Sequence, residues 1–561
     1  MAGLWPAFFL TALRALCETA AMRDLETDLQ TLRTVMAYAQ KRDFQRAAAL
    51  AEQTLASGFE HPLLLNVVAT WLEQQDRFED ALRLLERAVT IAPGDVGARN
   101  ALVLCLQRLD RPAEALQQVE TLLKQHANLG FAHANKGNAL IALGWLSRAK
   151  QSHLRAVELE PRSFVSLAAL ASIATQRGEH EEARRWAEQA LAIAPGFPDA
   201  VLSLAAAALD GGDTARAQLL LQQLILDLRA GPSDRARAMG LLGDVFDASG
   251  RYLEAFDAYR TCNDALRQIH RPLASGTSVL DYTGALAAAM RDAGSAGWAE
   301  PAPQADSAGA RGHVFLVGFP RSGTTLLEVL LDGHSDVASS EEHEFLTRGV
   351  LRFMREPLDL GPLLRADETQ LRALRRAYWE DVRHAGIDVV GKVFVDKHPL
   401  HTLKLPLIAR LFPQAKVLFA RRDPRDVVLS CFRRRFKMNA AMYELLTLRG
   451  AADFYAAVMG FAEQVQPILG LKWRVVRYES LIADLAREMH AICEFLELGW
   501  LPGMADFGAR AQAREHATPS TAQLARGLQG SSVQSWRHYT SSLQPILPML
   551  QPWVTRFDYP D

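Results

Sequence analysis

One stretch decides the fold of the C-terminal half of this 561-residue chain: HVFLVGFPRSGTTLLEVLL, residues 313–331. It opens with the apolar run 314–317, which predicts a buried strand, and continues into a tight turn rich in glycine and serine. Leucines at helical spacing follow the turn. A glycine-rich turn between a strand and a helix N-terminus directs backbone N–H groups toward an anion. The stretch therefore predicts a phosphate-binding loop in an α/β domain.

This loop lacks one residue that nucleoside triphosphatases use. Gly318 and Gly323 have the spacing of the P-loop motif, but Thr324 occupies the position of the lysine that contacts the β- and γ-phosphates. The loop is therefore suited to hold a phosphate and poorly suited to hydrolyse a nucleoside triphosphate, which disfavours a P-loop kinase. Arg321 supplies a positive charge inside the turn.

The length of the chain predicts two to four domains, because one hydrophobic core does not grow to this size. The net charge of −2 gives no reason to expect nucleic acid as a partner, so anions must be bound by local clusters. The five cysteines have no metal-binding spacing, and no apolar run is long enough to span a membrane. We expect a cytoplasmic protein without a structural metal. The apolar segment 4–13 is interpreted as a helix, with a signal peptide as the alternative.

The N-terminal half is a repeat array. Alanine recurs with a period of 34 residues, at Ala47, Ala81, Ala115, Ala149, Ala183 and Ala217. Gly or Asp stands five residues before these alanines in most repeats, where a turn between two helices requires them. The pattern resembles tetratricopeptide repeats, about seven of them. The resemblance implies an α-solenoid whose concave surface binds a peptide or protein partner; a spacer or dimerisation arm is the alternative.

These patterns divide the chain into four parts. Residues 1–27 form an N-terminal extension or helix, and residues 28–270 form the repeat solenoid. Residues 271–312 form a connecting helix and a linker rich in Gly, Ala and Pro. Residues 313–561 form the α/β domain, in which strand-like runs alternate with helical patterns, as in a parallel sheet covered by helices. After the first strand, further strands are expected at 389–390, 392–395, 416–420 and 473–477, and helices at 343–355, 368–384, 400–411, 425–436, 451–468 and 480–497.

A second basic turn follows the strand 416–420. Its sequence is RRDPRDVVLS, residues 421–430, with a helix start at Pro424 or Arg425. Seven Lys and Arg residues between 421 and 437 outnumber the two Asp residues, so a second phosphate without a metal fits better than a metal site. A solvated basic helix face is the alternative.

Two phosphate sites without the P-loop lysine point to a doubly phosphorylated nucleotide. At this point residues 313–561 resemble the sulfotransferase superfamily, and most closely its tyrosylprotein sulfotransferase branch. The resemblance implies 3′-phosphoadenosine 5′-phosphosulfate (PAPS) as the sulfuryl donor and no metal. It assigns the donor to Pro320, Arg321, Ser322, Gly323, Thr324 and Thr325 at the 5′-phosphosulfate, Arg422 and Ser430 at the 3′-phosphate, Tyr478 at the adenosine and Arg526 in a C-terminal loop. Arg434 either binds the 3′-phosphate as well or helps to attract an acidic acceptor.

The resemblance also implies catalytic residues. Glu342 matches the glutamate that takes the proton of the acceptor hydroxyl, with Glu341 and His343 as neighbours that are alternatives. Lys397 matches a lysine that stabilises the bridging oxygen, and Ser520 matches a serine with a similar role. A surface acidic turn and a solvated lysine are the alternatives for Glu342 and Lys397.

Two departures concern recognition of the acceptor. Glu344 stands where the tyrosylprotein branch has an arginine, and Ser535 stands where it has a lysine. We predict a sulfotransferase that acts on a protein or peptide tyrosine, with the repeats as the platform for a protein partner and a homodimer as a further possibility. The alternatives are a sugar, lipid or small-molecule hydroxyl as acceptor, and a nucleotide-binding scaffold without turnover.

Overall fold

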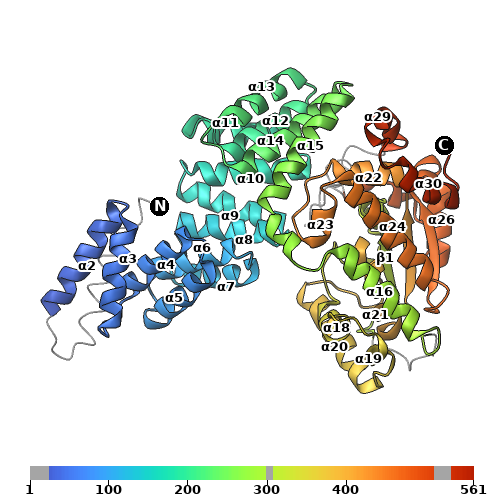
Figure 1. The fold of residues 1–561 in the computed structure, drawn as a ribbon, viewed down its shortest axis with the longest axis horizontal. Helices are drawn as coiled ribbons and strands as arrows, with labels where there is room; N and C mark the ends of the chain where they lie inside the picture. Colours follow the sequence, from blue (N-terminus) through green and yellow to red (C-terminus); the bar gives the residue numbers. More distant parts are fainter. Residues whose placement is uncertain (1–24, 299–306, 509, 511–531, 561) are drawn as a thin grey trace. The chain divides into compact units, whose positions relative to one another are not determined.

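The computed structural model describes residues 25–298, 307–508, 510 and 532–560. Helices fill the first half of the chain, and a domain that combines strands with helices follows (Figure 1). Within these ranges no helix combines the length and the apolar character needed to cross a lipid bilayer.

The chain divides into two compact units. One comprises Met1–Ile173 with Arg185–Ala200, and the other comprises Ala174–Arg184 with Val201–Asp561. The second unit therefore contains the last helices of the repeat array together with the α/β domain.

The repeat array consists of helices joined in pairs by short turns, which confirms the predicted all-α repeats. All six alanines of the 34-residue period are fully buried, since a methyl group is what two closely packed helices leave room for. Asp76 and Asp110, at the expected turns, have φ angles of 58° and 53°. The helices are α2 (Leu25–Gln40), α3 (Phe44–Ala56), α4 (Pro62–Gln74), α5 (Phe78–Ile91), α6 (Val96–Arg108), α7 (Pro112–Gln125), α8 (Gly130–Ala142), α9 (Leu146–Leu159), α10 (Phe164–Arg177), α11 (His180–Ile193), α12 (Pro198–Asp210), α13 (Thr214–Leu226), α14 (Pro232–Ala248) and α15 (Tyr252–Ile269).

The C-terminal domain contains a five-stranded sheet in the order β2-β3-β1-β4-β5, and all its neighbouring strands are parallel. The predicted parallel sheet is thus confirmed. The strand expected at 389–390 is absent from it, since Val390 is 68% exposed and β3 begins three residues later. The strands are β1 (Gly312–Gly318), β2 (Val337–Ser339), β3 (Val393–Lys397), β4 (Lys416–Arg421) and β5 (Lys472–Arg477).

Alternate side chains of the strands build two cores, one on each face of the sheet. Phe315 and Val317 lie in the larger core, whereas Val314 and Leu316 lie in the smaller one. The larger core includes residues of α16 (Val279–Ala293), α18 (Thr347–Phe353), α19 (Gly361–Leu364), α20 (Glu368–His384), η2 (Pro399–Lys404), α21 (Leu405–Leu411), α22 (Pro424–Phe432), α24 (Leu448–Val465), η5 (Ser535–Tyr539), α29 (Thr540–Leu543) and α30 (Leu547–Arg556). The smaller core includes residues of α17 (Thr324–Leu331), α25 (Tyr478–Ala483), α26 (Leu485–Leu496) and η3 (Pro502–Ala505). The short elements η1 (Arg271–Ser275) and α23 (Ala440–Glu444) have no buried residue, but Ala441 and Met442 of α23 pack against the larger core.

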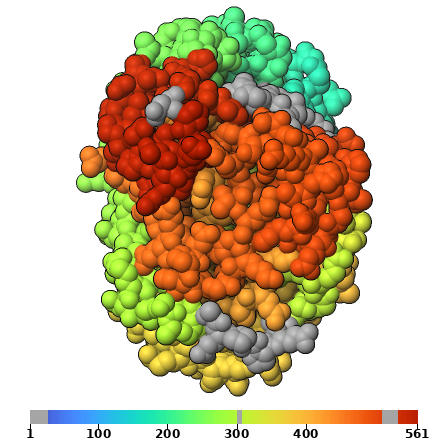
Figure 2. Space-filling view, turned by 90° about the vertical axis from the view of Figure 1, so that its right-hand side faces the viewer, coloured from blue at the N-terminus to red at the C-terminus, as the bar shows by residue number. Residues whose placement is uncertain are grey.

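The segment 532–560 is an integral part of this domain. In the space-filling view these red residues pack directly against the orange body of the domain (Figure 2). Leu550 and Val554 of α30 are buried in the larger core. Arg425 and Arg477 donate to the backbone carbonyls of Pro560 and Asp558.

The strand order places a topological switch at β1. From β1 the chain passes to β2 and β3 on one side of the sheet and then returns to β4 and β5 on the other. In open parallel sheets, ligands bind beyond the carboxyl ends of the strands at such a switch. The predicted site residues follow these carboxyl ends: Arg321 after β1, Glu342 after β2, Lys397 at the end of β3, Arg422 after β4 and Tyr478 after β5.

Candidate active site

The glycine-rich loop connects β1 to α17 and is held in an unusual conformation. Arg321 has a φ of 70°, which is rare for a residue with a side chain and typical of functional sites. Gly323 has a φ of 98°, and a Cβ atom there would lie 2.7 Å from the ring of Tyr478. Only glycine therefore lets the loop lie against Tyr478. The hydroxyl-bearing residues Ser322, Thr324 and Thr325 are all buried at the start of α17.

Thr402 of η2 is bonded to the start of this loop, a contact that no motif of the sequence indicates. Its Oγ1 accepts from the backbone N–H of Gly318 at 3.1 Å and donates to the Gly318 carbonyl at 2.7 Å. Both polar backbone groups at the end of β1 thus have a partner, which fixes the entry of the loop.

Residues predicted to bind the sulfuryl donor come together beyond β1, β4 and β5. We call this group the donor cluster; it consists of Arg321, Arg422, Ser430 and Tyr478. Arg321 Nε donates to Ser430 Oγ at 3.0 Å, and Arg422 donates to the Arg321 carbonyl at 3.2 Å. The Arg422 guanidinium lies 4.7 Å from the centroid of the Tyr478 ring, at a distance typical of a cation–π contact. The Tyr478 hydroxyl forms a hydrogen bond of 2.8 Å with Ser532 Oγ.

Positive charge accumulates in this cluster. Burial, together with the charges of Arg434 and Arg422, lowers the pKa of Arg321 to about 9. Burial also lowers the pKa of Arg434. Several guanidinium groups held close together in a poorly solvated site are stabilised by a bound anion, and their forked donors match phosphate oxygens. The residues present therefore fit a phosphorylated nucleotide.

A second cluster lies at the end of β3, where Lys397 is fully buried. Its ammonium lies 2.5 Å from Glu342 Oε1 and 3.2 Å from Glu328 Oε2. Glu328 is fully buried on α17, and its other oxygen accepts from the backbone N–H of Glu341 at 3.0 Å. A buried ion needs such partners, because removing a charge from water costs several kcal/mol. Glu328 thus joins the loop helix, the predicted lysine and the turn that carries the candidate base.

That turn follows β2 and is strained. Glu341 and Glu342 have φ angles of 48° and 71°, a conformation that costs a non-glycine residue of order 1–3 kcal/mol. Ser340 anchors the turn: its backbone N–H donates to the Val395 carbonyl, and its Oγ accepts from the Lys397 N–H at 2.7 Å. Of the three candidates for the base, Glu342 forms an ion pair with Lys397, whereas the His343 ring contacts the Ser340 carbonyl.

A buried polar network lies on the opposite face of β3, because Asp396 points away from its neighbour Lys397. Asp396 accepts a hydrogen bond of 2.7 Å from the Tyr378 hydroxyl, and its other oxygen lies 3.5 Å from His401 Nδ1. Burial raises the pKa of Asp396 to about 7 and lowers the pKa of His401 to about 3. Both groups therefore favour their uncharged forms in the folded protein.

We expect Asp396→Asn to change how stability depends on pH. The pKa of Asp396 rises from 3.8 to about 7 on folding. Its contribution to the free energy of unfolding is therefore complete below pH 4 and is lost as the pH rises through 7. The buried histidines His313 and His401, each with a pKa lowered to about 3, make stability rise with pH instead. The contribution of Asp396 is therefore obtained from the difference in free energy of unfolding between wild type and the variant.

Between pH 5 and pH 8 the free energy of unfolding of wild type relative to Asp396→Asn should fall by about 2–3 kcal/mol. Urea unfolding at several pH values measures this difference. Asp388→Asn, at an exposed carboxylate, is the control: its free energy of unfolding should change with pH as that of wild type does. If the free energy of unfolding of Asp396→Asn also changes with pH as that of wild type does, the raised pKa assigned to Asp396 is wrong.

Glu344, one of the two departures, is paired within the domain. It forms an ion pair with Lys404, and its carboxylate lies 3.4 Å from His401 Nε2. Burial alone would raise the pKa of Glu344, but the hydrogen bond with His401 and the charge of Lys404 hold it below the ordinary value. A negative charge therefore stands two residues from the candidate base.

Ser520 and Arg526 lie outside the described residues, but Asp426 anchors the segment that follows them. Its carboxylate accepts from the backbone N–H groups of Gln534 and Trp536 at 2.7 and 2.9 Å, and from Ser535 Oγ at 3.0 Å. It also lies 4.0 Å from Arg422. Asp426 thus links the segment 532–560 to the donor cluster, and its sequence context alone did not indicate this role.

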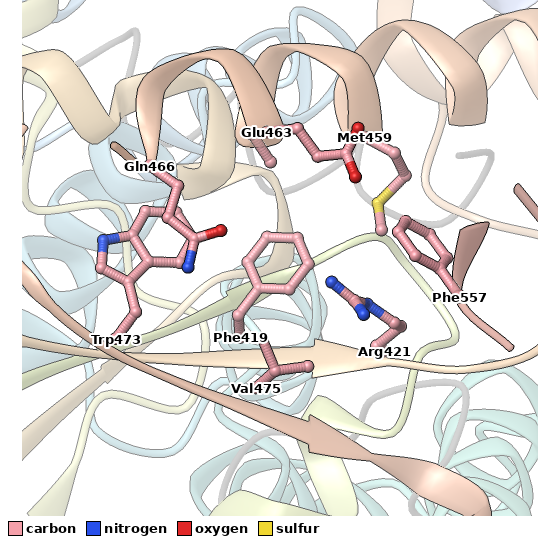
Figure 3. A pocket seen from close by; sticks show the side chains of 9 residues that line it. Phe419, Arg421, Met459, Glu463, Gln466, Trp473, Val475 and Phe557 are labelled. Atoms are coloured by element: carbon pink, nitrogen blue, oxygen red, sulfur yellow. The ribbon is translucent and has the colours of Figure 1, made fainter. Parts of the chain in front are cut away.

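A small pocket lies elsewhere in the domain, over β4 and β5 (Figure 3). Arg421 lines it, and its guanidinium lies 3.9 Å from the centroid of the Phe557 ring. Met459, Glu463 and Gln466 of α24 also line the pocket, and none of the residues 320–325 does. This pocket is therefore separate from the donor cluster. Across the described ranges, no three or more His, Cys, Asp or Glu side chains form a group that could hold a metal ion.

Comparisons with known proteins agree with both halves. Residues 313–502 match the model of the sulfotransferase family. Models of the tetratricopeptide repeat match residues 32–96, 72–135, 165–194 and 202–262.

Curated proteins match part of the chain. A protein-tyrosine sulfotransferase of Drosophila melanogaster is 29% identical over 200 residues, which are 33% of this chain and 38% of that protein. Protein-tyrosine sulfotransferase 2 of Gallus gallus is 28% identical over 194 residues, which are 33% of this chain and 51% of that protein. An uncharacterized protein of Aquifex aeolicus (strain VF5) is 28% identical over 268 residues, which are 45% of this chain and 34% of its own length. The chain thus spans about half the length of these relatives or less.

Among solved structures, a tetratricopeptide repeat protein from Parabacteroides merdae ATCC 43184 covers 42% of this chain and 92% of its own, with 18% identity and a TM-score of 0.35.

Proposed function

We propose that this chain, which carries a sulfotransferase-family domain after an array of tetratricopeptide repeats, transfers a sulfuryl group from PAPS to an acceptor hydroxyl. One observation carries the proposal: Arg321, Ser430, Arg422 and Tyr478 form one connected cluster at the carboxyl ends of β1, β4 and β5. The match of residues 313–502 to the sulfotransferase family supports PAPS as the nucleotide.

PAPS supplies an activated sulfuryl group, and 3′,5′-ADP leaves when that group is transferred. In our proposal the loop 320–325 and the N-terminus of α17 hold the phosphosulfate end, as backbone N–H groups at a helix start hold anions. Arg422, Ser430 and Arg434 hold the 3′-phosphate. Tyr478, which lies against Gly323 and under Arg422, borders the adenosine.

The second cluster activates the acceptor in this proposal. Glu342 takes the proton of the acceptor hydroxyl while the hydroxyl oxygen forms a bond to sulfur and the bond from sulfur to the phosphate oxygen breaks. The Lys397 ammonium has three N–H donors, and two of them face Glu328 and Glu342. The third is suited to stabilise the negative charge that develops on the bridging oxygen.

A protein or peptide tyrosine is the acceptor that the relatives suggest, since several of them are named protein-tyrosine sulfotransferases. The repeats, a module that binds proteins in many chains, are the proposed platform for the acceptor or for another partner. One observation favours a different acceptor: Glu344 stands where the tyrosylprotein branch has an arginine and is paired with Lys404, so this position offers no positive charge to an acidic peptide. A sugar, lipid or small-molecule hydroxyl is therefore the second candidate.

Transfer of labelled sulfate from PAPS distinguishes these acceptors. A peptide library and a panel of glycans and phenols are offered to the same enzyme, and label in tyrosine peptides alone supports the first candidate. Label in glycans or phenols alone replaces it with the second.

Binding of the product nucleotide tests the donor site before any acceptor is known. We expect 3′,5′-ADP to bind in isothermal titration and Arg422→Ala to weaken it by about 10- to 100-fold, because charge-assisted contacts to phosphate are lost. Arg421→Ala is a matched control, since that neighbouring side chain lies in the separate pocket against Phe557. If wild type does not bind 3′,5′-ADP, the proposed function is wrong.

A cytoplasmic location is proposed as well. The four cysteines in the described ranges, Cys105, Cys262, Cys431 and Cys493, are free and buried, as is common in reducing compartments.

A further inference from the structure

The last helix pair of the repeat array, α14 and α15, is longer than the pairs before it. The two helices have 17 and 18 residues, whereas each helix from α3 to α13 has 13 or 14. In the sequence, the repeated alanine Ala255 follows Ala217 by 38 residues in place of 34. This pair also belongs to the compact unit that contains the α/β domain.

Two carboxylates of α14 bind the basic run that follows α22. Arg433 lies 2.5 Å from Asp247 Oδ2, and Arg435 lies 2.7 Å from Asp244 Oδ2. Asp244 and Asp247 are one helical turn apart, so both face the same run of arginines. The two arginines flank Arg434, a proposed ligand of the 3′-phosphate.

Tyrosine hydroxyls complete the coordination of both carboxylates. Tyr259 of α15 donates to Asp244 Oδ1 at 2.9 Å, and Tyr539 of η5 donates to Asp247 Oδ1. The charges of Arg435, Arg434 and Arg433 lower the pKa of Asp244, although burial acts in the opposite direction. Both carboxylates therefore have a partner at each oxygen, in a partly buried site where such bonds are strong.

The same helix pair also fixes the backbone ahead of the arginines. Asn263, buried on α15, donates to the Phe432 carbonyl at 2.9 Å, and the Phe256 ring stacks on the Phe432 ring with centroids 5.3 Å apart. Gly240 of α14 makes room for Arg435, because a Cβ atom there would lie 2.7 Å from Arg435 Cδ. The end of α22 is thus held from several directions.

We propose that Asp244 and Asp247 are positioning residues for the donor site: they bind Arg433 and Arg435, which fixes the backbone that presents Arg434 to the 3′-phosphate. The last repeat is therefore part of the nucleotide site in addition to being part of a partner-binding array. Arg434 lies close enough to the glycine-rich loop for its charge to lower the pKa of Arg321. This inference rests on the proposed function, since it takes the anion cluster to be the site of PAPS.

The experiment compares the affinities of the 561-residue chain for two nucleotides. We expect the double variant Asp244→Asn with Asp247→Asn to bind 3′,5′-ADP about tenfold more weakly than wild type, because one charge-assisted contact to phosphate is misplaced. Affinity for adenosine 5′-phosphate, which lacks the 3′-phosphate, should change by less than about twofold. In turnover, KM for PAPS should rise with kcat nearly unchanged. Isothermal titration and steady-state kinetics measure these quantities.

Two further variants separate positioning from stability. Asp247→Glu, which keeps the charge, should bind 3′,5′-ADP almost as tightly as wild type does. Asp257→Asn, at an exposed carboxylate of α15 that pairs with Arg260, should bind both nucleotides as wild type does.

The inference is overturned if the double variant binds 3′,5′-ADP like wild type, or if it loses affinity for both nucleotides equally. A wild-type chain that binds neither nucleotide would instead overturn the proposed function, so the two failures are distinguishable.

Discussion

Replacing Lys397 with methionine is expected to lower kcat for sulfuryl transfer by a factor of about 10²–10³, while 3′,5′-ADP still binds. The Lys397 side chain is fully buried at the end of β3, where its ammonium forms ion pairs with Glu328 and Glu342. In the proposed mechanism its charge acts on the bridging oxygen only while the bond to sulfur breaks, so its loss should affect kcat more than the affinity for nucleotide. Steady-state kinetics and isothermal titration on the same preparation test this.

The control for this variant addresses folding. Removing Lys397 leaves the Glu328 carboxylate buried without its positively charged partner, and breaking a buried ion pair from one side costs about 3–5 kcal/mol. The double variant Glu328→Gln with Lys397→Met removes both charges, which should restore much of the stability without restoring turnover. A folded double variant with wild-type kcat would show that Lys397 has no catalytic role.

Glu342→Gln is expected to lower kcat by a factor of about 10²–10⁴, because the amide cannot accept the proton of the acceptor hydroxyl. The Glu342 side chain is 37% exposed, and glutamine keeps an oxygen for Lys397, so stability should change little. Transfer of labelled sulfate to the best acceptor measures the loss. Affinity for 3′,5′-ADP should stay within about twofold of wild type, since no contact to phosphate is removed.

Two neighbours provide matched controls for this prediction. Glu341 has the same charge and the same left-handed backbone, but its N–H is bound to Glu328, and His343 contacts the Ser340 carbonyl. Glu341→Gln and His343→Gln should each retain most of the wild-type kcat. If either loses as much as Glu342→Gln, the base has been assigned to the wrong residue of the turn.

The fold could be predicted from the sequence wherever a local pattern repeats. The 34-residue alanine period predicted the helix pairs, and alternation of apolar runs with helical patterns predicted a parallel sheet. The helix expected at 368–384 coincides with α20. The three-residue strand β2 is too short to show a period in the sequence. The apolar pair Val389-Val390 resembles a strand, although Val390 begins a turn.

The residues of the candidate site also fall into those that a local pattern predicts and those that it does not. Residues near strand ends, such as Arg321, Lys397 and Arg422, were predicted from motifs, and the structure places them at one edge of the sheet. Glu328 was missed because it lies inside a leucine-rich helical pattern, where a single polar residue gives no signal of its own. Asp244 and Asp247 act on arginines almost 200 residues further along the chain, a pairing that no local pattern contains.

The anchoring of residues 532–560 has a consequence for how the protein is made on the ribosome. Arg422 donates to the Ser532 carbonyl, Asp426 binds the backbone that follows, and α30 fills part of the larger core. A nascent chain that has emerged only as far as β5 already contains the glycine-rich loop, Lys397 and Arg422, but it lacks the residues that hold Arg422 and Asp426 in place. If the proposed function is right, nucleotide binding should therefore be acquired only after α30 has left the exit tunnel.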